Sequence, residues 1–253
     1  MKNIFKNHRS TLVVPDDEQF SLSKAIVLHL FPGMVIMSVF TLLSLATRSF
    51  SSLPPIFWFT VAIPLGLIPA ELGYLLYLGK QRNGKLSLKG IIAYQVPLKW
   101  SQYLWMIPVA FVSLIALAII VGIADGIIYS NLFSWWPDRI NMSIVDPLTW
   151  TLPVVIVMNS IFSNIIGPVI EEMYFRGYLL PRLERFGRWA ILINTFLFAL
   201  YHFWSPWHLV QRTISSMPLA VSAKYGSLKV SMIAHVLANT VGFWLTVLPL
   251  LLT

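Results

Sequence analysis

Two adjacent acidic residues, Glu171 and Glu172, follow directly on a long apolar run, and residues 148–170 contain no charged residue. An ionised carboxylate that faces hydrocarbon is costly, so charged side chains at membrane depth usually face a partner or a water-filled cavity. A carboxylate in a cavity of low dielectric constant is suited to proton transfer, and it can also bind a metal ion. The pair therefore predicts a polar site inside the membrane, with partners supplied by other segments.

Two further pairs of residues have the spacing of a single helix face. His202 follows Phe198 by four residues, and Asn239 follows His235 by four residues. Side chains at positions i and i+4 lie on the same side of a helix, so each pair is expected to point in one direction. The other histidines in apolar segments, His29 and His208, are interpreted as interfacial, because aromatic and amphipathic side chains collect where a membrane meets water.

Arg176 follows Glu172 by four residues, which is the favourable order for an ion pair on a helix. Glu171 lies about 100° further round the same helix and is expected to point elsewhere. At about 1.5 Å per residue, the acidic and histidine side chains fall in one layer, roughly 9 to 21 Å from the inner membrane face. Gly167 and Pro168 precede the acidic pair and would loosen one helical turn, which helps water to reach it.

The composition predicts an all-α, polytopic transmembrane helical bundle. Of the 253 residues, 57% are hydrophobic and only 11% are charged, whereas soluble domains have about 25% charged residues. Seven apolar segments are long enough to be predicted as spans, at about residues 25–46, 56–78, 106–122, 148–181, 189–202, 207–223 and 230–252. An eighth is possible if the segment at residues 86–105 or the segment near Ile127 enters the membrane. The stretch 86–105 also has the composition of an interfacial amphipathic helix.

The distribution of charge predicts the orientation. The net charge is +8, but the basic residues are concentrated in short loops, such as residues 80–99 with five lysines or arginines and no acid. The positive-inside rule explains this pattern without a nucleic-acid partner. We therefore expect a multi-pass integral membrane protein, in the cell membrane if the source is bacterial, with residues 1–24 as a cytoplasmic tail and a cytoplasmic opening of the site. Transmembrane helices are expected in residues 25–147 and a catalytic core in residues 148–253.

Taken together, the three motifs resemble those of the CPBP family. They are Glu171-Glu172-x-x-x-Arg176, Phe198-x-x-x-His202 and His235-x-x-x-Asn239, in that order. The family comprises membrane proteases and includes CAAX prenyl endopeptidases of the Rce1-like type, bacteriocin-immunity proteins and abortive-infection proteins. The resemblance extends over about residues 148–252, and the first half of the chain is similar only in being helical and apolar.

The resemblance implies an intramembrane endopeptidase that cleaves a membrane-associated or lipidated protein or peptide. Glu171 and His202 would activate water as general base and acid, and His235 with Asn239 would hold the oxyanion of the tetrahedral intermediate. Glu172, Arg176 and Phe198 would have supporting roles. No cofactor is needed in this version. In the alternative, zinc would be bound by Glu171, His202 and His235, although the sequence has no HExxH motif.

Two other functions remain open from the sequence. A non-catalytic immunity or tethering protein of the same family would use the same residues to bind a partner. A proton-coupled transporter could use the carboxylate and histidine groups as a relay, but the chain shows no inverted repeat or paired broken helices, which transporters often have. The sequence therefore favours the protease, with membrane lipid and a peptide or lipidated protein as its partners.

Overall fold

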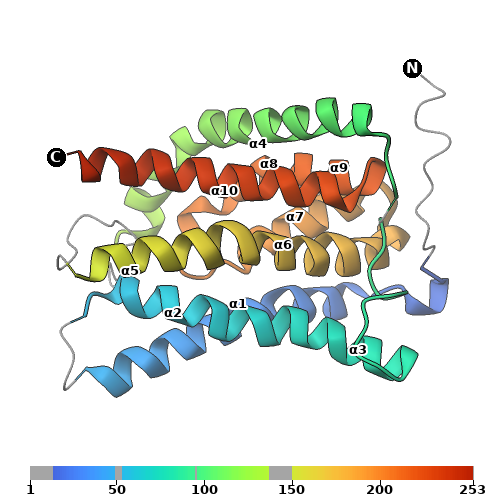
Figure 1. Ribbon diagram of the computed structural model, residues 1–253, viewed down its shortest axis with the longest axis horizontal. Coiled ribbons are helices and arrows are strands. Elements are labelled where there is room, and N and C mark those ends of the chain that lie inside the picture. The colour runs from blue at the N-terminus through green and yellow to red at the C-terminus, as the bar shows by residue number, and fades with distance from the viewer. Residues whose placement is uncertain (1–13, 49–52, 95, 137–149, 253) are drawn as a thin grey trace.

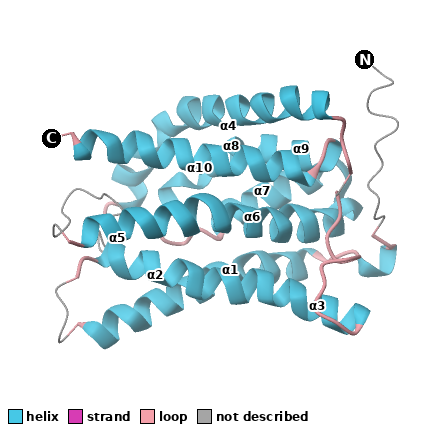
Figure 2. Ribbon diagram, viewed as in Figure 1, coloured by secondary structure: helices cyan, strands magenta, loops and turns pink. Residues whose placement is uncertain are grey.

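The computed structural model describes residues 14–48, 53–94, 96–136 and 150–252, and these residues form helices and connecting loops without strands. The helices lie side by side along the long axis of the molecule (Figures 1 and 2). The all-α prediction is confirmed. The predicted start of the fourth span at residue 148 lies outside the described residues.

The first half of the chain provides three long helical runs. The first is α1 (Leu22–Thr47). The second joins α2 (Pro55–Leu67), the π-helical segment η2 (Ile68–Gly73) and α3 (Tyr74–Asn83). The third is α4 (Trp100–Ile128), which continues into η3 (Tyr129–Phe133). A short 3-10 turn, η1 (Asp16–Glu18), precedes them.

The second half begins with a helical run that carries the acidic pair. It comprises α5 (Thr151–Met158), η5 (Asn159–Ile166), α6 (Gly167–Glu171), η6 (Glu172–Leu179) and η7 (Leu180–Trp189). The run bends at Gly187, whose φ of 57° lies in the left-handed region that favours glycine. After the bend, α7 (Ala190–Leu200) packs back against η6 (Figure 1).

The chain then forms η8 (Pro206–His208), α8 (Leu209–Ser215), α9 (Met217–Tyr225) and α10 (Leu228–Leu251). Five helical runs in the described residues are long and apolar enough to cross a membrane: Leu22–Thr47, Pro55–Asn83, Trp100–Phe133, Thr151–Leu200 and Leu228–Pro249. The chain is thus a polytopic membrane protein. The figure of seven to eight spans stays a prediction, because α7, α8 and α9 are short and the Thr151–Leu200 run includes the bend at Gly187.

The predicted amphipathic helix near residues 86–105 is wrong over most of its length. Residues 84–94 and 96–99 form turns and loops, and helix begins only at Trp100. Gly84 and Gly90 both have positive φ angles, which end the helix and redirect the chain. Residues 91–94 of this loop are buried: the Ala93 N–H donates to the Gly177 carbonyl at 2.8 Å, and the Leu228 N–H donates to the Tyr94 carbonyl at 2.8 Å. The loop therefore connects η6 with the start of α10.

Charged side chains tie several segments together at one end of the bundle. Glu18 accepts from Arg82 at 3.2 Å and from Arg182 at 3.0 Å. The Phe20 N–H donates to the Arg182 carbonyl at 2.8 Å, so part of the predicted tail packs on the helices. Burial, with the adjacent Glu184 carboxylate as a second cause, raises the pKa of Tyr94 above its ordinary value. The phenol therefore stays protonated and donates to Glu184 at 2.8 Å.

Gly33 gives the first testable prediction, because it lets α1 approach the loop that follows α7. A Cβ at Gly33 would lie 2.1 Å from the carbonyl oxygen of Tyr201. Gly33→Ala is therefore expected to lower the free energy of unfolding by about 1–3 kcal/mol, because backbone has to move. Thermal unfolding of purified protein in detergent measures the effect.

Gly126→Ala is the matched control. A Cβ at Gly126, in α4, would meet nothing within 4 Å, so this change is expected to leave stability unchanged or raise it by up to about 1 kcal/mol. Equal unfolding temperatures for the two variants would contradict the close approach of α1 to Tyr201.

Candidate active site

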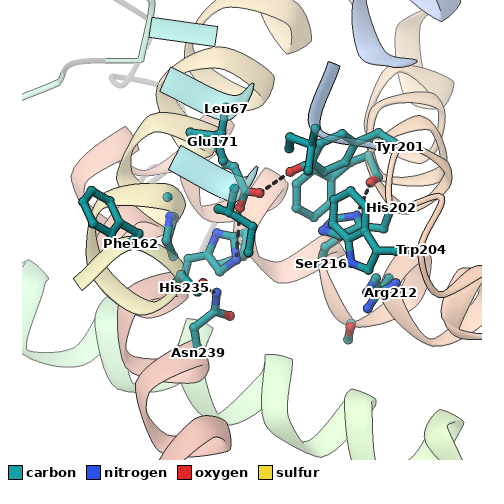
Figure 3. A pocket seen from close by; sticks show the side chains of 18 of the residues that line it. Leu67, Phe162, Glu171, Tyr201, His202, Trp204, Arg212, Ser216, His235 and Asn239 are labelled. Atoms are coloured by element: carbon teal, nitrogen blue, oxygen red, sulfur yellow. Dashed lines mark hydrogen bonds and ion pairs between the residues drawn. The ribbon is translucent and has the colours of Figure 1, made fainter. Parts of the chain in front are cut away.

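The motif residues meet where the α6–η6 junction, the end of α7 and the middle of α10 come together. Glu171, His202, His235 and Asn239 all line one cavity of about 280 Å³. In Figure 3, Glu171, His235 and Asn239 lie on one side of this cavity, and Tyr201, His202 and Trp204 lie on the other. Apolar side chains from α1 and α2 complete the lining, among them Ile36 and Leu67.

Glu171 is buried and presents its two carboxylate oxygens to different partners. The Tyr201 hydroxyl donates a hydrogen bond to Oε1, and Oε2 lies 3.8 Å from Nε2 of His235. Tyr201 itself is held in place by ring contacts with Phe175 and Phe198. The Tyr201 bond fixes the carboxylate plane and leaves Oε2 directed towards His235, as Figure 3 shows.

Glu172 is fully buried and contacts three polar side chains from two elements, η6 and α10. It lies 2.9 Å from Nδ1 of His235 and 3.2 Å from Nη1 of Arg176, and the Ser231 hydroxyl donates to it. Because a carboxylate only accepts when ionised, Nδ1 of His235 must carry a proton. Glu171 and Glu172 therefore face different nitrogens of one imidazole, although their side chains leave the helix in different directions.

Phe198 forms the apolar contact between the three motifs. The guanidinium carbon of Arg176 lies 3.9 Å from the centre of its ring, a cation–π geometry. The same ring meets His202 and His235 edge to face, with centroid distances of 5.0 and 6.2 Å. Arg176 is fully buried, so the Phe198 face compensates for part of the water that its guanidinium has lost.

His202 lies just after α7, and its tautomer follows from one contact. Nδ1 lies 2.8 Å from the Phe198 carbonyl, which can only accept, so Nδ1 donates and Nε2 is left as an acceptor. No hydrogen bond or ion pair connects His202 with Glu171 in the described part of the chain. The two residues share a cavity, while Tyr201 is the group that contacts Glu171.

Asn239 lies one helical turn beyond His235 on α10. Its Nδ2 donates to the Ser163 carbonyl at 3.0 Å, which fixes the orientation of the amide and leaves one N–H for another acceptor. Ser163 belongs to η5, so this contact connects α10 with the helical run that carries the acidic pair.

Four polar residues near the site were missed from the sequence. They are Tyr201, Ser231, Arg212 and Glu71. Tyr201 is adjacent to His202, and Ser231 lies four residues before His235 on the same helix face, so both could have been found by their spacing. Glu71 is an acid within the second apolar segment, and it is fully buried with neither carboxylate oxygen hydrogen-bonded in the described chain.

The interfacial interpretation of His29 is wrong. His29 is fully buried between helices: Nδ1 donates to the Ala25 carbonyl at 2.7 Å, and Nε2 accepts from Asn194 at 3.1 Å. His208 is partly exposed, lies 2.7 Å from Asp125 and accepts from the Trp207 indole at 3.0 Å. Both histidines therefore join helices through hydrogen bonds.

The side chains do not form a metal-binding set as they are arranged. Among the described residues, no three His, Asp or Glu side chains gather in a way that would hold a metal ion. Glu171 Oε1 is bonded to Tyr201, and each of His202 and His235 uses Nδ1 for a contact within the protein. The proposed zinc ligands Glu171, His202 and His235 thus share the cavity without converging on one point.

Phe198→Leu tests the contact between the motifs. Loss of the ring removes the cation–π contact with Arg176 and the edge contacts with His202 and His235. We expect a lower free energy of unfolding, by about 1–3 kcal/mol, measured by thermal unfolding in detergent.

Phe196→Leu is the matched control, because Phe196 lies on the same helix, α7, and is 42% exposed. We expect little change in its unfolding temperature. If both substitutions lower the unfolding temperature by the same amount, Phe198 has no special role in holding Arg176.

The part of the chain that matches a known protein family is the part that carries the site residues. Residues 149–241 match the model of the family described as type II CAAX prenyl endopeptidase, Rce1-like. The match includes all three motifs and excludes α1 to α4. Comparison with curated proteins and with solved structures gave no significant match. Residues 149–241 are therefore similar to the Rce1-like family of CAAX prenyl endopeptidases.

Proposed function

We propose that this protein is an intramembrane endopeptidase that hydrolyses a peptide bond of a membrane-associated or lipidated substrate without a metal ion. Glu171 and His202 activate water, and His235 with Asn239 holds the oxyanion. The observation that carries the proposal is the position of His235, with Glu172 on Nδ1 and Glu171 near Nε2. The family match supports peptidase chemistry.

Glu171 is the proposed general base. Its Oε1 is occupied by Tyr201, so Oε2, which faces the cavity and His235, takes the proton from water. The apolar surroundings exclude bulk water and strengthen each electrostatic interaction within the cavity. Tyr201 orients the carboxylate and is therefore a positioning residue.

His235 and Asn239 are the proposed oxyanion donors. With protons on both ring nitrogens, His235 donates from Nδ1 to Glu172 and from Nε2 to the oxyanion in the cavity. Asn239 adds its second Nδ2–H, since the first is bonded to Ser163. Fixed donors of this kind stabilise the developing negative charge because they need no reorganisation during the reaction.

The reaction balances with these groups alone. Water loses a proton to Glu171, and its oxygen forms a bond to the carbonyl carbon, which gives a tetrahedral oxyanion facing His235 and Asn239. Glu171 then passes its proton to Nε2 of His202, which can accept it within the cavity. As the C–N bond breaks, His202 donates this proton to the leaving nitrogen. The products are a carboxylic acid and an amine.

Orientation and extent are also part of the proposal. Residues 148–253 form the catalytic core, although α1 and α2 contribute to the cavity lining. The end of the bundle that carries Arg82 and Arg182 faces the cytoplasm, which the positive-inside rule supports. We place the protein in the cell membrane if the source is bacterial, with the site opening towards the cytoplasm.

Hydrolysis by protein in liposomes tests the proposed function. The substrates are a fluorogenic peptide that ends in a farnesylated CAAX sequence and the same peptide without the farnesyl group. We expect wild type to cleave at least one of them. Glu171→Gln and His202→Ala are expected to reduce kcat/KM by about 10²–10⁴-fold, with unfolding temperatures close to that of wild type.

Glu184→Gln is the control, since Glu184 lies outside the cavity with its side chain 41% exposed. Its kcat/KM should stay within about twofold of wild type. Binding of the peptides without cleavage, unaffected by Glu171→Gln, would favour the non-catalytic immunity or tethering function. Loss of cleavage with a chelator, restored by zinc, would replace the metal-free mechanism with the zinc-dependent one.

A further inference from the structure

Arg212 is a cationic side chain that lines the proposed catalytic cavity but belongs to none of the three motifs. It lies on α8, and Figure 3 draws it near Trp204, on the side of the cavity opposite Glu171. Its Nη1 donates to the Ser205 carbonyl at 3.1 Å. A guanidinium has five N–H donors, so most of them have no protein acceptor among the hydrogen bonds of the described residues.

The nearby acids are occupied by other partners. Asp125 lies 2.7 Å from His208, and Glu171 accepts from Tyr201 and faces His235. In the described ranges, no carboxylate lies within ion-pair distance of Arg212, whereas Arg176, which is fully buried, is 3.2 Å from Glu172. An unneutralised cation within an apolar bundle is costly, and an anion that enters the cavity would remove this cost.

We infer that Arg212 binds a carboxylate group of the substrate and so determines which substrates are cleaved. The inference rests on the proposed function. The planar guanidinium presents paired N–H groups that match the two oxygens of a carboxylate, which an amide or ester matches poorly. With this group at Arg212, the peptide extends across the cavity and its scissile bond lies at the side that carries Glu171, His235 and Asn239.

The carboxylate has two possible sources, the C-terminus of the substrate or an acidic side chain close to the cleavage site. Three versions of the peptide cleaved by wild type separate them: one with a free C-terminus, one with a C-terminal amide, and an amide whose last residue is glutamate. If Arg212 binds only the C-terminus, the peptide with the free C-terminus is the only one preferred. If it binds any nearby carboxylate, the peptide with the free C-terminus and the amide that ends in glutamate are both preferred. Either pattern supports the inference.

Wild type is expected to prefer a carboxylate-bearing peptide to the plain amide by about 10- to 100-fold in kcat/KM, mainly through KM. Arg212→Gln should abolish the preference while cleavage of the plain amide remains within a few-fold of wild type. Arg212→Lys keeps the charge and loses the planar fork, so an intermediate preference is expected. Arg212→Lys also tests the inference if the Arg212→Gln variant does not fold. Arg188→Gln, at an exposed arginine outside the cavity, should keep the full preference.

Binding measurements separate failure of this inference from failure of the proposed function. Peptide dissociation constants are measured for Glu171→Gln and for the Glu171→Gln/Arg212→Gln double variant in liposomes. If wild type cleaves nothing but the single variant still prefers the carboxylate peptide and the double variant does not, the proposed function fails and the role of Arg212 stands. Three outcomes overturn the inference. They are equal binding of the acid and amide peptides, no binding of the acid peptide, and a preference for the acid peptide that survives Arg212→Gln.

Discussion

The buried carboxylate of Glu172 is the interaction on which the site depends. It is fully buried and contacts groups from two helical runs, Arg176 on its own helix and Ser231 and His235 on α10. Removing one partner of a buried ion pair typically costs about 3–5 kcal/mol, because the other charge is left without compensation. The same contacts that hold α10 against η6 therefore also set the tautomer and direction of His235, so packing and catalytic geometry are established together.

The first half of the chain serves the site without supplying its motif residues. Gly33 allows α1 to reach the backbone of Tyr201, which orients Glu171, and Ile36 and Leu67 close the cavity. The loop at Ala93 and Tyr94 bonds to Gly177 on one side and Leu228 on the other. The loop contacts use backbone atoms, so they constrain the side chains of Ala93 and Tyr94 little, whereas the close approach at Gly33 requires a residue without a Cβ.

Much of the fold and the core of the site could be predicted from the sequence because apolar runs and i, i+4 spacing are local signals. Glu172 with Arg176, and His235 with Asn239, are recognisable as helix-face pairs, and the apolar runs predict the helices. Contacts between distant segments carry no such signal. Neither the stacking of Arg176 on Phe198 nor the Tyr201–Glu171 hydrogen bond follows from spacing, since each depends on how α7 packs against the helix of the acidic pair. The composition predicts helix at residues 84–94, which form a loop, because a mixed apolar and basic pattern does not reveal that Gly84 and Gly90 have positive φ.

Glu71 shows why charge alone does not locate a catalytic group. Like Glu171, it is an acid in an apolar segment, it is buried, and its helix packs against α6. Glu171, however, accepts from Tyr201 and opens onto the cavity, whereas neither oxygen of Glu71 has a hydrogen-bond partner in the described chain and Glu71 does not line that cavity. A base must reach its substrate proton as well as be buried. Access and a fixed orientation, both set by tertiary contacts, are therefore what distinguish Glu171 as the candidate base.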